Sequence, residues 1–250
     1  MDYSEYNNEC NRILQLVKKY ENCYEECFNN IRGEVVREEF CIGGELLHRG
    51  YYCPSLISDI VISNVKRGRL VKKEPTNKEE YFRYGFDKDD NLVTVIRPYL
   101  YEFIVREGNT EIGVGFNKQN GVMEISEAYC EDNRIASYGH YIYDEGMDIH
   151  EYRKEFYTYR AACLSVDCIN YLCAYAPFLS HSEYNFTLRE GFLDTYTVKQ
   201  YKAYNGETMK SLGFDEEFLQ QLAEVKEKRQ TKFKEQDEEV YKVRVRRRVR

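Results

Sequence analysis

Cysteine and histidine are the residues of this chain best suited to nucleophilic or metal chemistry, and it has nine of the first and four of the second. The histidines are His48, His140, His150 and His181. They form no HExxH or HxxxH pattern, and no CxxC pair offers the thiolates of a zinc site. Cys163, Cys168 and Cys173 recur every five residues, a spacing that points successive side chains in different directions on a helix or a strand. We therefore expect buried thiols, no metal site and no cofactor.

A cysteine nucleophile needs a histidine that is close in space but not in sequence. Cys163 with His140 or His181 could form such a pair, so a cysteine-dependent hydrolase stays open as an alternative. Gly113 and Gly115 do not form a phosphate loop, because they stand inside a strand pattern, where glycine marks a bulge or close packing. We assign no catalytic residue and do not expect an enzyme.

Carboxylates gather at two places along the chain. Asp87, Asp89 and Asp90 resemble a metal-binding loop, but the β-patterned runs on both sides favour a hairpin turn. The second group stands in YDEGMDIHEYRKEF, which we interpret as an insertion that forms a loop. Its members are Asp144, Glu145, Asp148 and Glu151. Loops on rigid β scaffolds commonly carry binding residues, so we expect this group to contact a partner.

Strand alternation predicts a second acidic surface. Tyr101, Phe103 and Val105 share one face of a strand, which we expect to lie in the core. The opposite face of the sheet would then present carboxylates on a partly wet surface. These carboxylates are Glu102, Glu111 and Glu124. Tyrosines beside such carboxylates suit recognition of a basic protein.

The last eleven residues, VYKVRVRRRVR, are the one strongly basic stretch. The chain carries a net charge of −7 and this stretch +6, so residues 1–239 carry −13. An acidic body repels phosphate backbones, and a basic protein is the better partner. The alternation of Tyr241, Val243 and Val245 with basic residues predicts a short edge strand or a disordered end. It could support self-association, and a nucleic-acid-binding module that uses the arginines is a further alternative.

Composition places the chain among globular proteins. Hydrophobic residues make up 42% and charged residues 32% of its 250 residues. The longest apolar stretch, LSVDCINYLCAYAPFL, contains Asp167 and Asn170 and falls short of the ~20 residues of a membrane span. The start, MDYSEYNNEC, is not typical of a signal peptide, and an odd number of cysteines favours reduced thiols. We expect a cytoplasmic protein that does not cross a membrane.

Apolar periodicity predicts a helix at each end of the chain. Residues at spacings of three and four mark a helix over 4–31 that ends before Gly33. A second helix is predicted over 214–239, with charged residues on most of its later half. Between the helices, residues 34–75 indicate two hairpins, one around Gly43 and Gly44 and one around Gly68.

From residue 81 onward, β-patterned runs alternate with polar turns every ten to thirteen residues. Such a succession predicts an antiparallel meander. It contains a hairpin repeat of 30 residues, in which three positions recur. They are Phe86, Leu92 and Tyr99, matched by Phe116, Val122 and Tyr129.

The expected fold class is therefore α+β. It comprises an N-terminal helix (1–33), a long curved antiparallel β-meander with hairpin repeats (34–204), and a C-terminal helix with a basic tail (205–250). We expect the three parts to form one structural domain.

YFRYGFDKDDNLVTVIRPY, and the succession of aromatic-x-aromatic strands with acidic turns over roughly residues 79–204, resemble immunity proteins of bacterial polymorphic toxin systems. The resemblance implies a cytosolic antitoxin that binds one cognate toxin domain and blocks its active site or substrate cleft. It carries over no functional residue. The acidic, tyrosine-bearing surface fits such a role if the toxin domain is basic, because opposite charges steer the encounter.

Overall fold

The computed structural model describes residues 3–42, 48–58, 68–76, 81–132, 134–144, 148–172, 176–203 and 241–242. Two α-helices come first, α1 (Tyr3–Tyr20) and α2 (Tyr24–Glu34), and a short 3-10 helix, η1, spans Gly50–Tyr52. The strands are β1 (Arg37–Ile42), β2 (Arg69–Val71), β3 (Tyr81–Phe86), β4 (Leu92–Arg97), β5 (Leu100–Glu107), β6 (Thr110–Phe116), β7 (Val122–Glu131), β8 (Arg134–Asp144), β9 (Asp148–Tyr159), β10 (Cys163–Leu172), β11 (Ala176–Arg189), β12 (Phe192–Ala203) and β13 (Tyr241–Lys242).

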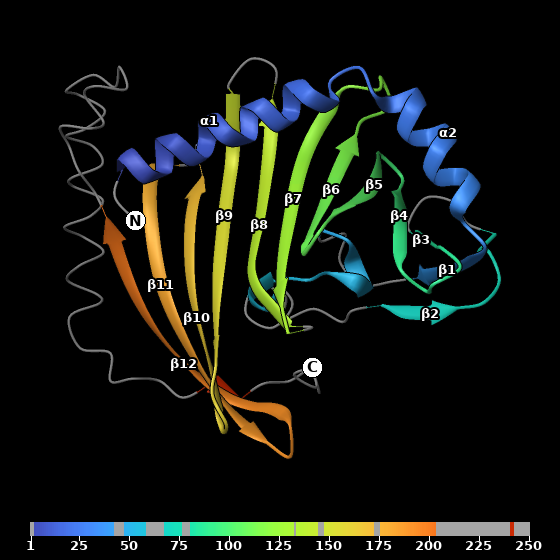
Figure 1. The fold of residues 1–250 in the computed structure, drawn as a ribbon. Coiled ribbons are helices and arrows are strands. Elements are labelled where there is room, and N and C mark those ends of the chain that lie inside the picture. The colour runs from blue at the N-terminus through green and yellow to red at the C-terminus, as the bar shows by residue number, and fades with distance from the viewer. Residues whose placement is uncertain are drawn as a thin grey trace.

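All of these strands belong to one antiparallel sheet of 13 strands, in the order β13-β12-β11-β10-β9-β8-β7-β6-β5-β4-β3-β1-β2. From β3 to β12 each strand pairs with the next one along the chain, which is the pattern of a meander. The sheet is strongly curved, and both helices lie on one side of it (Figure 1).

Two of the hairpin turns share one geometry. Asp87 accepts hydrogen bonds from the backbone N–H groups of residues 89 and 91, and Asn117 accepts them from residues 119 and 121. Asp90 and Asn120 both take the left-handed conformation, with φ 64°. The two turns lie 30 residues apart, and each follows a strand that ends in Phe. The third pair of the repeat differs, because Tyr99 lies in a turn and Tyr129 inside β7.

The expected α+β fold class, with a helix at each end of the sheet, is wrong. The described structure is mostly one antiparallel sheet, and its two α-helices both precede the sheet. The predicted helix over 214–239 lies outside the described residues, so no described element supports it.

The single N-terminal helix expected over residues 4–31 is wrong as well, because the structure has two helices there, α1 and α2. Tyr20 ends α1, and the N–H of Cys23 donates to the Tyr20 carbonyl at 2.9 Å before α2 begins. The apolar spacing continues through this break, which is why periodicity alone predicted a single helix. The break changes the helix direction, so that α1 and α2 follow different parts of the curved sheet (Figure 1).

The hairpin expected around Gly43 and Gly44 is wrong as well, because its second arm is a turn and a 3-10 helix, and the first arm of the hairpin expected around Gly68 lies largely outside the described residues. β1 pairs with β3 on one side and with β2 on the other, and both neighbours come later in the chain. Gly43 and Gly44 lie outside the described residues, and Gly68 directly precedes β2. Between β1 and β2, residues 48–58 pack against the sheet on the side opposite to the helices.

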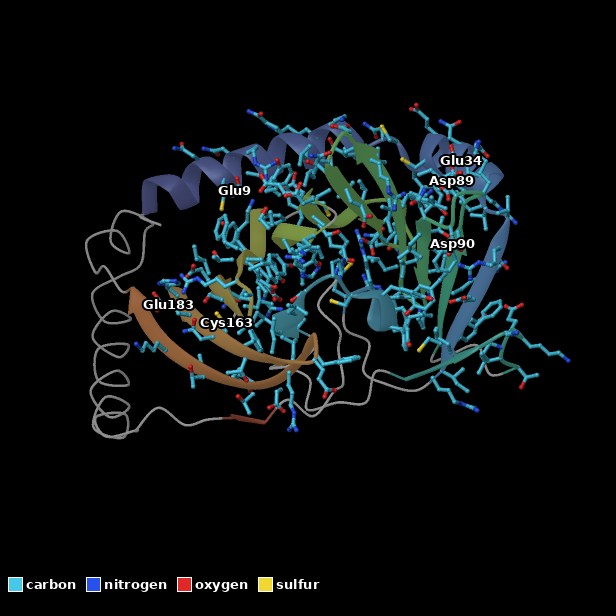
Figure 2. All side chains as sticks on the ribbon, turned by 60° about the horizontal axis from the view of Figure 1, so that its bottom comes forward. Glu9, Glu34, Asp89, Asp90, Cys163 and Glu183 are labelled. Atoms are coloured by element: carbon cyan, nitrogen blue, oxygen red, sulfur yellow. The ribbon has the colours of Figure 1, made fainter. Side chains whose placement is uncertain are left out.

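The sheet therefore has two covered faces. The helix face is the one against which α1 and α2 pack, and its core includes Ile13, Val17, Phe103, Val114 and Tyr141. The inner face is the one around which the sheet curves to enclose residues 48–58, and it packs residues such as Leu56, Ile57, Tyr138 and Leu164 (Figure 2). Tyr101, Phe103 and Val105 contribute to the helix face, as the strand alternation predicts.

The basic end forms an edge strand where it is described. Tyr241 pairs with Tyr196, and Lys242 pairs with Thr195, so that β13 lies beside β12 at one end of the sheet. The remaining residues of the tail, 243–250, lie outside the described part of the chain. Among the described helices, none is both long enough and apolar enough to cross a membrane.

Candidate functional site

Arg49 is the centre of a buried ionic cluster between residues 48–58 and the inner face. Its side chain is fully buried and reaches three strands. Its Nε donates to Glu102 Oε1 on β5 at 2.7 Å, and Nη2 donates to Ser126 Oγ on β7 at 2.9 Å. Nη1 contacts Glu111 on β6, whose carboxylate also pairs with Arg106 at 3.0 Å. A single arginine therefore fastens this segment to β5, β6 and β7.

Local backbone geometry turns Arg49 toward the sheet. Arg49 and Gly50 both have left-handed φ values, 51° and 50°. The Tyr84 hydroxyl donates to the Arg49 carbonyl at 3.1 Å and accepts from the Tyr51 N–H at 3.0 Å. A Cβ atom at Gly50 would lie 2.7 Å from the Phe82 ring, so glycine is required there for close approach as well as for φ.

Gly113 makes room for the charged groups. A Cβ atom there would lie 2.0 Å from Glu102 Oε1, 2.4 Å from Ser126 Oγ and 2.5 Å from Arg49 Nη2. Gly115 similarly faces Glu124, whose Cγ would be 2.4 Å from an added Cβ. The expectation of close packing at these two glycines is confirmed. In the sequence, only the Gly-x-Gly pattern inside a strand indicated that other side chains approach this part of β6.

Two histidines complete the cluster. The rings of His48 and His140 lie 4.2 Å apart between centroids. His48 Nδ1 is hydrogen-bonded to the Tyr138 hydroxyl, and its Nε2 lies 3.3 Å from Glu102 Oε1 and 3.7 Å from Glu124 Oε1. His140 Nε2 lies 3.4 Å from Glu124 Oε2. Sequence reasoning missed this meeting because His48 and His140 are 92 positions apart and fit no motif.

The charges in the cluster are set by burial and by the arginines. Burial alone would raise the pKa of both Glu102 and Glu124, but Arg49 holds the pKa of Glu102 well below its usual range. Arg97 is the main cause that lowers the pKa of Glu124 to about 2. Burial, helped by His140, lowers the pKa of His48 to about 4. At neutral pH both carboxylates are therefore ionised and the His48 ring is neutral.

A second group of side chains on the inner face, around Glu155, holds residues 55 and 56 against the sheet. Glu155 is fully buried and accepts a hydrogen bond from Ser55 Oγ at 2.5 Å and another from the Tyr157 hydroxyl. The Leu56 N–H donates to the same tyrosine oxygen at 3.2 Å. Burial raises the pKa of Glu155, because the hydrogen bonds from Ser55 and Tyr157 and the charge of Arg153 only partly offset the loss of water.

The structure corrects the placement of the acidic surface expected on this face. Glu102 is 1% exposed and Glu124 is 6% exposed, and both are balanced by arginines rather than presented to solvent. Glu111 is partly exposed but holds Arg49 and Arg106. Alternation assigned the three residues to one face correctly. It could not show that residues 48–58 fold over that face.

The second acidic group lies in strands and not in an inserted loop. Asp144 ends β8 and pairs with Asp148, which begins β9, so the structure brings these two together across a hairpin. Glu151 lies within β9, and its Oε1 is 3.7 Å from Arg153 Nη2. Glu145 lies outside the described residues.

Neither proposed cysteine–histidine pair forms. Cys163 pairs with Thr187, whereas His181 pairs with Ile169, six residues farther along β10 or about 20 Å away. His140 is aligned through Arg153 with Asn170, which is farther still from Cys163. Burial also raises the pKa of the Cys168 thiol to about 12 and that of Cys27 to about 11, which keeps both protonated.

The cluster Asp87, Asp89 and Asp90 is a hairpin turn, as expected from its flanks. Asp87 accepts hydrogen bonds from backbone N–H groups, and Asp90 forms an ion pair with Arg37. Figure 2 places Asp89 and Asp90 at the opposite end of the molecule from Cys163 and Glu183. The acidic turn of Asp89 and Asp90 therefore lies far from the acidic residue Glu183.

A row of side chains crosses the helix face beyond α1. Its members are consecutive cross-strand neighbours, Tyr129, Ser137, Phe156, Asp167 and Glu183, and we call it the outer row. Glu127 and Lys154 contact α1, and Tyr129 and Phe156 follow them by two positions, so they share that face. Tyr129 is 38% exposed and Phe156 is 39% exposed. Sequence reasoning did not single out this row, because register between strands cannot be read from alternation.

Comparisons of the chain with protein-family models, with curated proteins and with solved structures give no match.

Proposed function

We propose that this protein is an immunity protein that binds a basic toxin domain and blocks its active site or substrate cleft. The outer row is the observation that carries this proposal. It joins two exposed aromatic side chains to two carboxylates on neighbouring strands of one face. Buried aromatic anchors dominate the binding energy of protein interfaces, and charge complementarity speeds the encounter.

The outer row is rigid because its members stand on paired strands. The five strands β7 to β11 are hydrogen-bonded in register and span roughly 20 Å at this level of the sheet. A surface held this way loses little conformational entropy on binding. The polar residues of the next row along these strands, Thr158, Ser165 and Asn185, would form a wet rim.

Net charge supports a basic partner. Residues 1–239 carry −13, and the outer row contributes Asp167 and Glu183 on adjacent strands. His181 Nε2 lies 3.2 Å from Asp167 Oδ1 on the same surface. The protein would act by occlusion alone, in the cytoplasm, where the reduced thiols of the described chain are stable.

The experiment is rescue of a bacterial cell from each protein encoded beside this one. We expect one neighbour to kill when expressed alone and to be neutralised by this chain. Phe156→Ala combined with Asp167→Lys should abolish rescue and weaken binding of the purified toxin at least 100-fold. Tyr99→Ala is the matched control, since Tyr99 is 70% exposed but lies in the turn between β4 and β5. Absence of a toxic neighbour, or full rescue by the double variant, would overturn the proposal.

A further inference from the structure

Three buried side-chain polar atoms of the described residues lack hydrogen-bond partners. They are His48 Nε2, Arg97 Nε and Glu102 Oε2. His48 is 8% exposed, so bulk water does not satisfy its nitrogen. A buried imidazole nitrogen without a hydrogen-bond partner is costly, which makes His48 Nε2 a candidate metal ligand.

The surrounding groups converge on the same point. His48, Glu124 and His140 each offer a ligand atom, and these atoms lie within 4.8 Å of one another. Two of the separations are shorter, 3.7 Å from His48 Nε2 to Glu124 Oε1 and 3.4 Å from His140 Nε2 to Glu124 Oε2. Ligand atoms about 2.1 Å from a tetrahedral ion would be about 3.4 Å from one another.

The supporting hydrogen bonds also fit a metal site. His48 Nδ1 is engaged by the Tyr138 hydroxyl, which leaves Nε2 as the ring nitrogen that can coordinate. Glu102 Oε1, which lies 3.3 Å from His48 Nε2, is held by Arg49 Nε at 2.7 Å and is not a ligand. Partners of this kind set the tautomer and the direction of metal ligands in proteins.

We propose that His48, His140 and Glu124 form a structural site for a divalent transition metal, with Zn²⁺ as its ion. Imidazole ligands favour Zn²⁺ over Mg²⁺ and Ca²⁺, which prefer oxygen alone. The three ligands come from residues 48–58, β7 and β8, so the ion would act as a cross-link between them. This role does not depend on the proposed immunity function.

Arg97 would compete with the ion for the Glu124 carboxylate. It contacts Glu124, and its side chain is 14% exposed, so it lies at the rim of the cluster. A dication adds two positive charges to carboxylates that Arg49 and Arg97 already neutralise. Binding therefore requires Arg97 to turn toward solvent. Removing its charge should tighten binding, which distinguishes a metal site from a purely structural ion-pair network.

The test uses the full chain, stripped with a chelator and titrated with Zn²⁺ and, for its absorption spectrum, with Co²⁺. We expect one ion per chain, a rise in melting temperature with Zn²⁺, and a Co²⁺ spectrum typical of nitrogen and oxygen ligands. Arg97→Gln should bind Zn²⁺ at least tenfold more tightly than the wild type. His140→Asn should bind it at least 100-fold more weakly.

His181→Asn is the matched control. Asp167, His181 and Glu183 form a second group that could hold an ion, and it lies on the outer surface of the sheet. Binding that survives in His140→Asn and disappears in His181→Asn would place the ion there and overturn the proposal. It is equally overturned if the stripped wild type and Arg97→Gln both take up no Co²⁺ or Zn²⁺, a readout that does not depend on whether His140→Asn folds.

Discussion

Arg49 places a permanent charge inside the protein, and the carboxylates around it make that arrangement stable. The pKa of Arg49 is raised by Glu102 and Glu111 although burial alone would lower it. A buried ion pair of this kind adds little compared with an apolar pair, but breaking it leaves a lone charge out of water. The effect of a substitution at Arg49 therefore reflects the charge that remains behind.

Arg49→Met should lower the free energy of unfolding by about 3 to 5 kcal/mol, because Glu102 keeps its charge in the interior without a counter-ion. Urea denaturation at pH 7 measures the change. Arg106→Met is the control, since its side chain is 36% exposed and pairs only at the surface, so it should change stability by less than about 1 kcal/mol. Equal effects of the two variants would contradict the central role given to Arg49.

Gly113→Ala tests whether the buried ionic cluster around Arg49 needs the space left by the missing side chain of Gly113. Its added methyl group would clash with Glu102 and Ser126 at 2.0 and 2.4 Å, so we expect a loss of about 2 to 4 kcal/mol. Gly33→Ala, in α2, meets no atom within 4 Å and should be neutral or stabilising by up to about 1 kcal/mol. Thermal unfolding of both variants gives the comparison. A neutral Gly113→Ala would mean that the buried groups can rearrange freely.

At the scale of elements, α1 is attached to the sheet by ion pairs as well as by its apolar side. Glu9 pairs with Lys154 on β9 at 2.6 Å and accepts from the Tyr141 hydroxyl on β8 at 2.9 Å. Arg12 contacts both Glu9 and Glu127 of β7. These contacts set where α1 crosses the strands, beside the apolar contacts of Ile13 and Val17.

The attachment of α1 should weaken in acid. Burial alone would raise the pKa of Glu9, but the hydrogen bonds from Arg12 and Lys154 lower it to about 2 from an ordinary value of 4.5. Its stabilising contribution is therefore complete above pH 4.5 and is lost as the pH falls toward about 2.

Glu9→Gln should accordingly lower stability by about 1 to 3 kcal/mol at pH 7, a range that allows for partial exposure, and by almost nothing near pH 2. Urea titrations across this pH range measure the difference. Glu21→Gln, at an exposed position just after α1, provides the control and should change stability by less than about 1 kcal/mol at pH 7. A constant difference between wild type and Glu9→Gln at all pH values would exclude the ion pairs as its cause.

At the scale of the whole molecule, one curved sheet organises two independent surfaces. Its inner face closes over residues 48–58 with balanced charges, and on its helix face Tyr129 and Phe156 of the outer row are exposed. The proposed metal site belongs to the first surface and the proposed toxin contact to the second. Variants of one surface should therefore leave the other unchanged, because distant sites act additively.

The basic tail, residues 240–250, affects the whole molecule because its charge of +6 partly offsets the −13 of residues 1–239. Deleting residues 240–250 removes β13 and six cations, and we expect DNA and RNA binding to be equally weak before and after the deletion. Binding at roughly 50 and 200 mM salt measures this, since phosphate contacts weaken steeply over that range. Tight binding by the intact chain that disappears on deletion would favour a nucleic-acid-binding module instead.

Local features of the protein follow from the sequence alone. Alternation placed Tyr101 and Phe103 on the face opposite to Glu102, and turn chemistry located the hairpins at Asp87 and Asn117. These features depend on backbone preferences and on neighbours within a few residues, so the sequence determines them without reference to the rest of the chain.

Burial and charge pairing were decided only by the tertiary structure. Nothing near Glu102 in the sequence indicates that Arg49, 53 positions earlier, would cover it, and the same holds for His48 and His140. The break between α1 and α2 follows the curvature of a sheet that forms from later residues. Whether a carboxylate faces water or an arginine depends on which segment folds over its face, and long-range packing sets that outcome while local pattern does not.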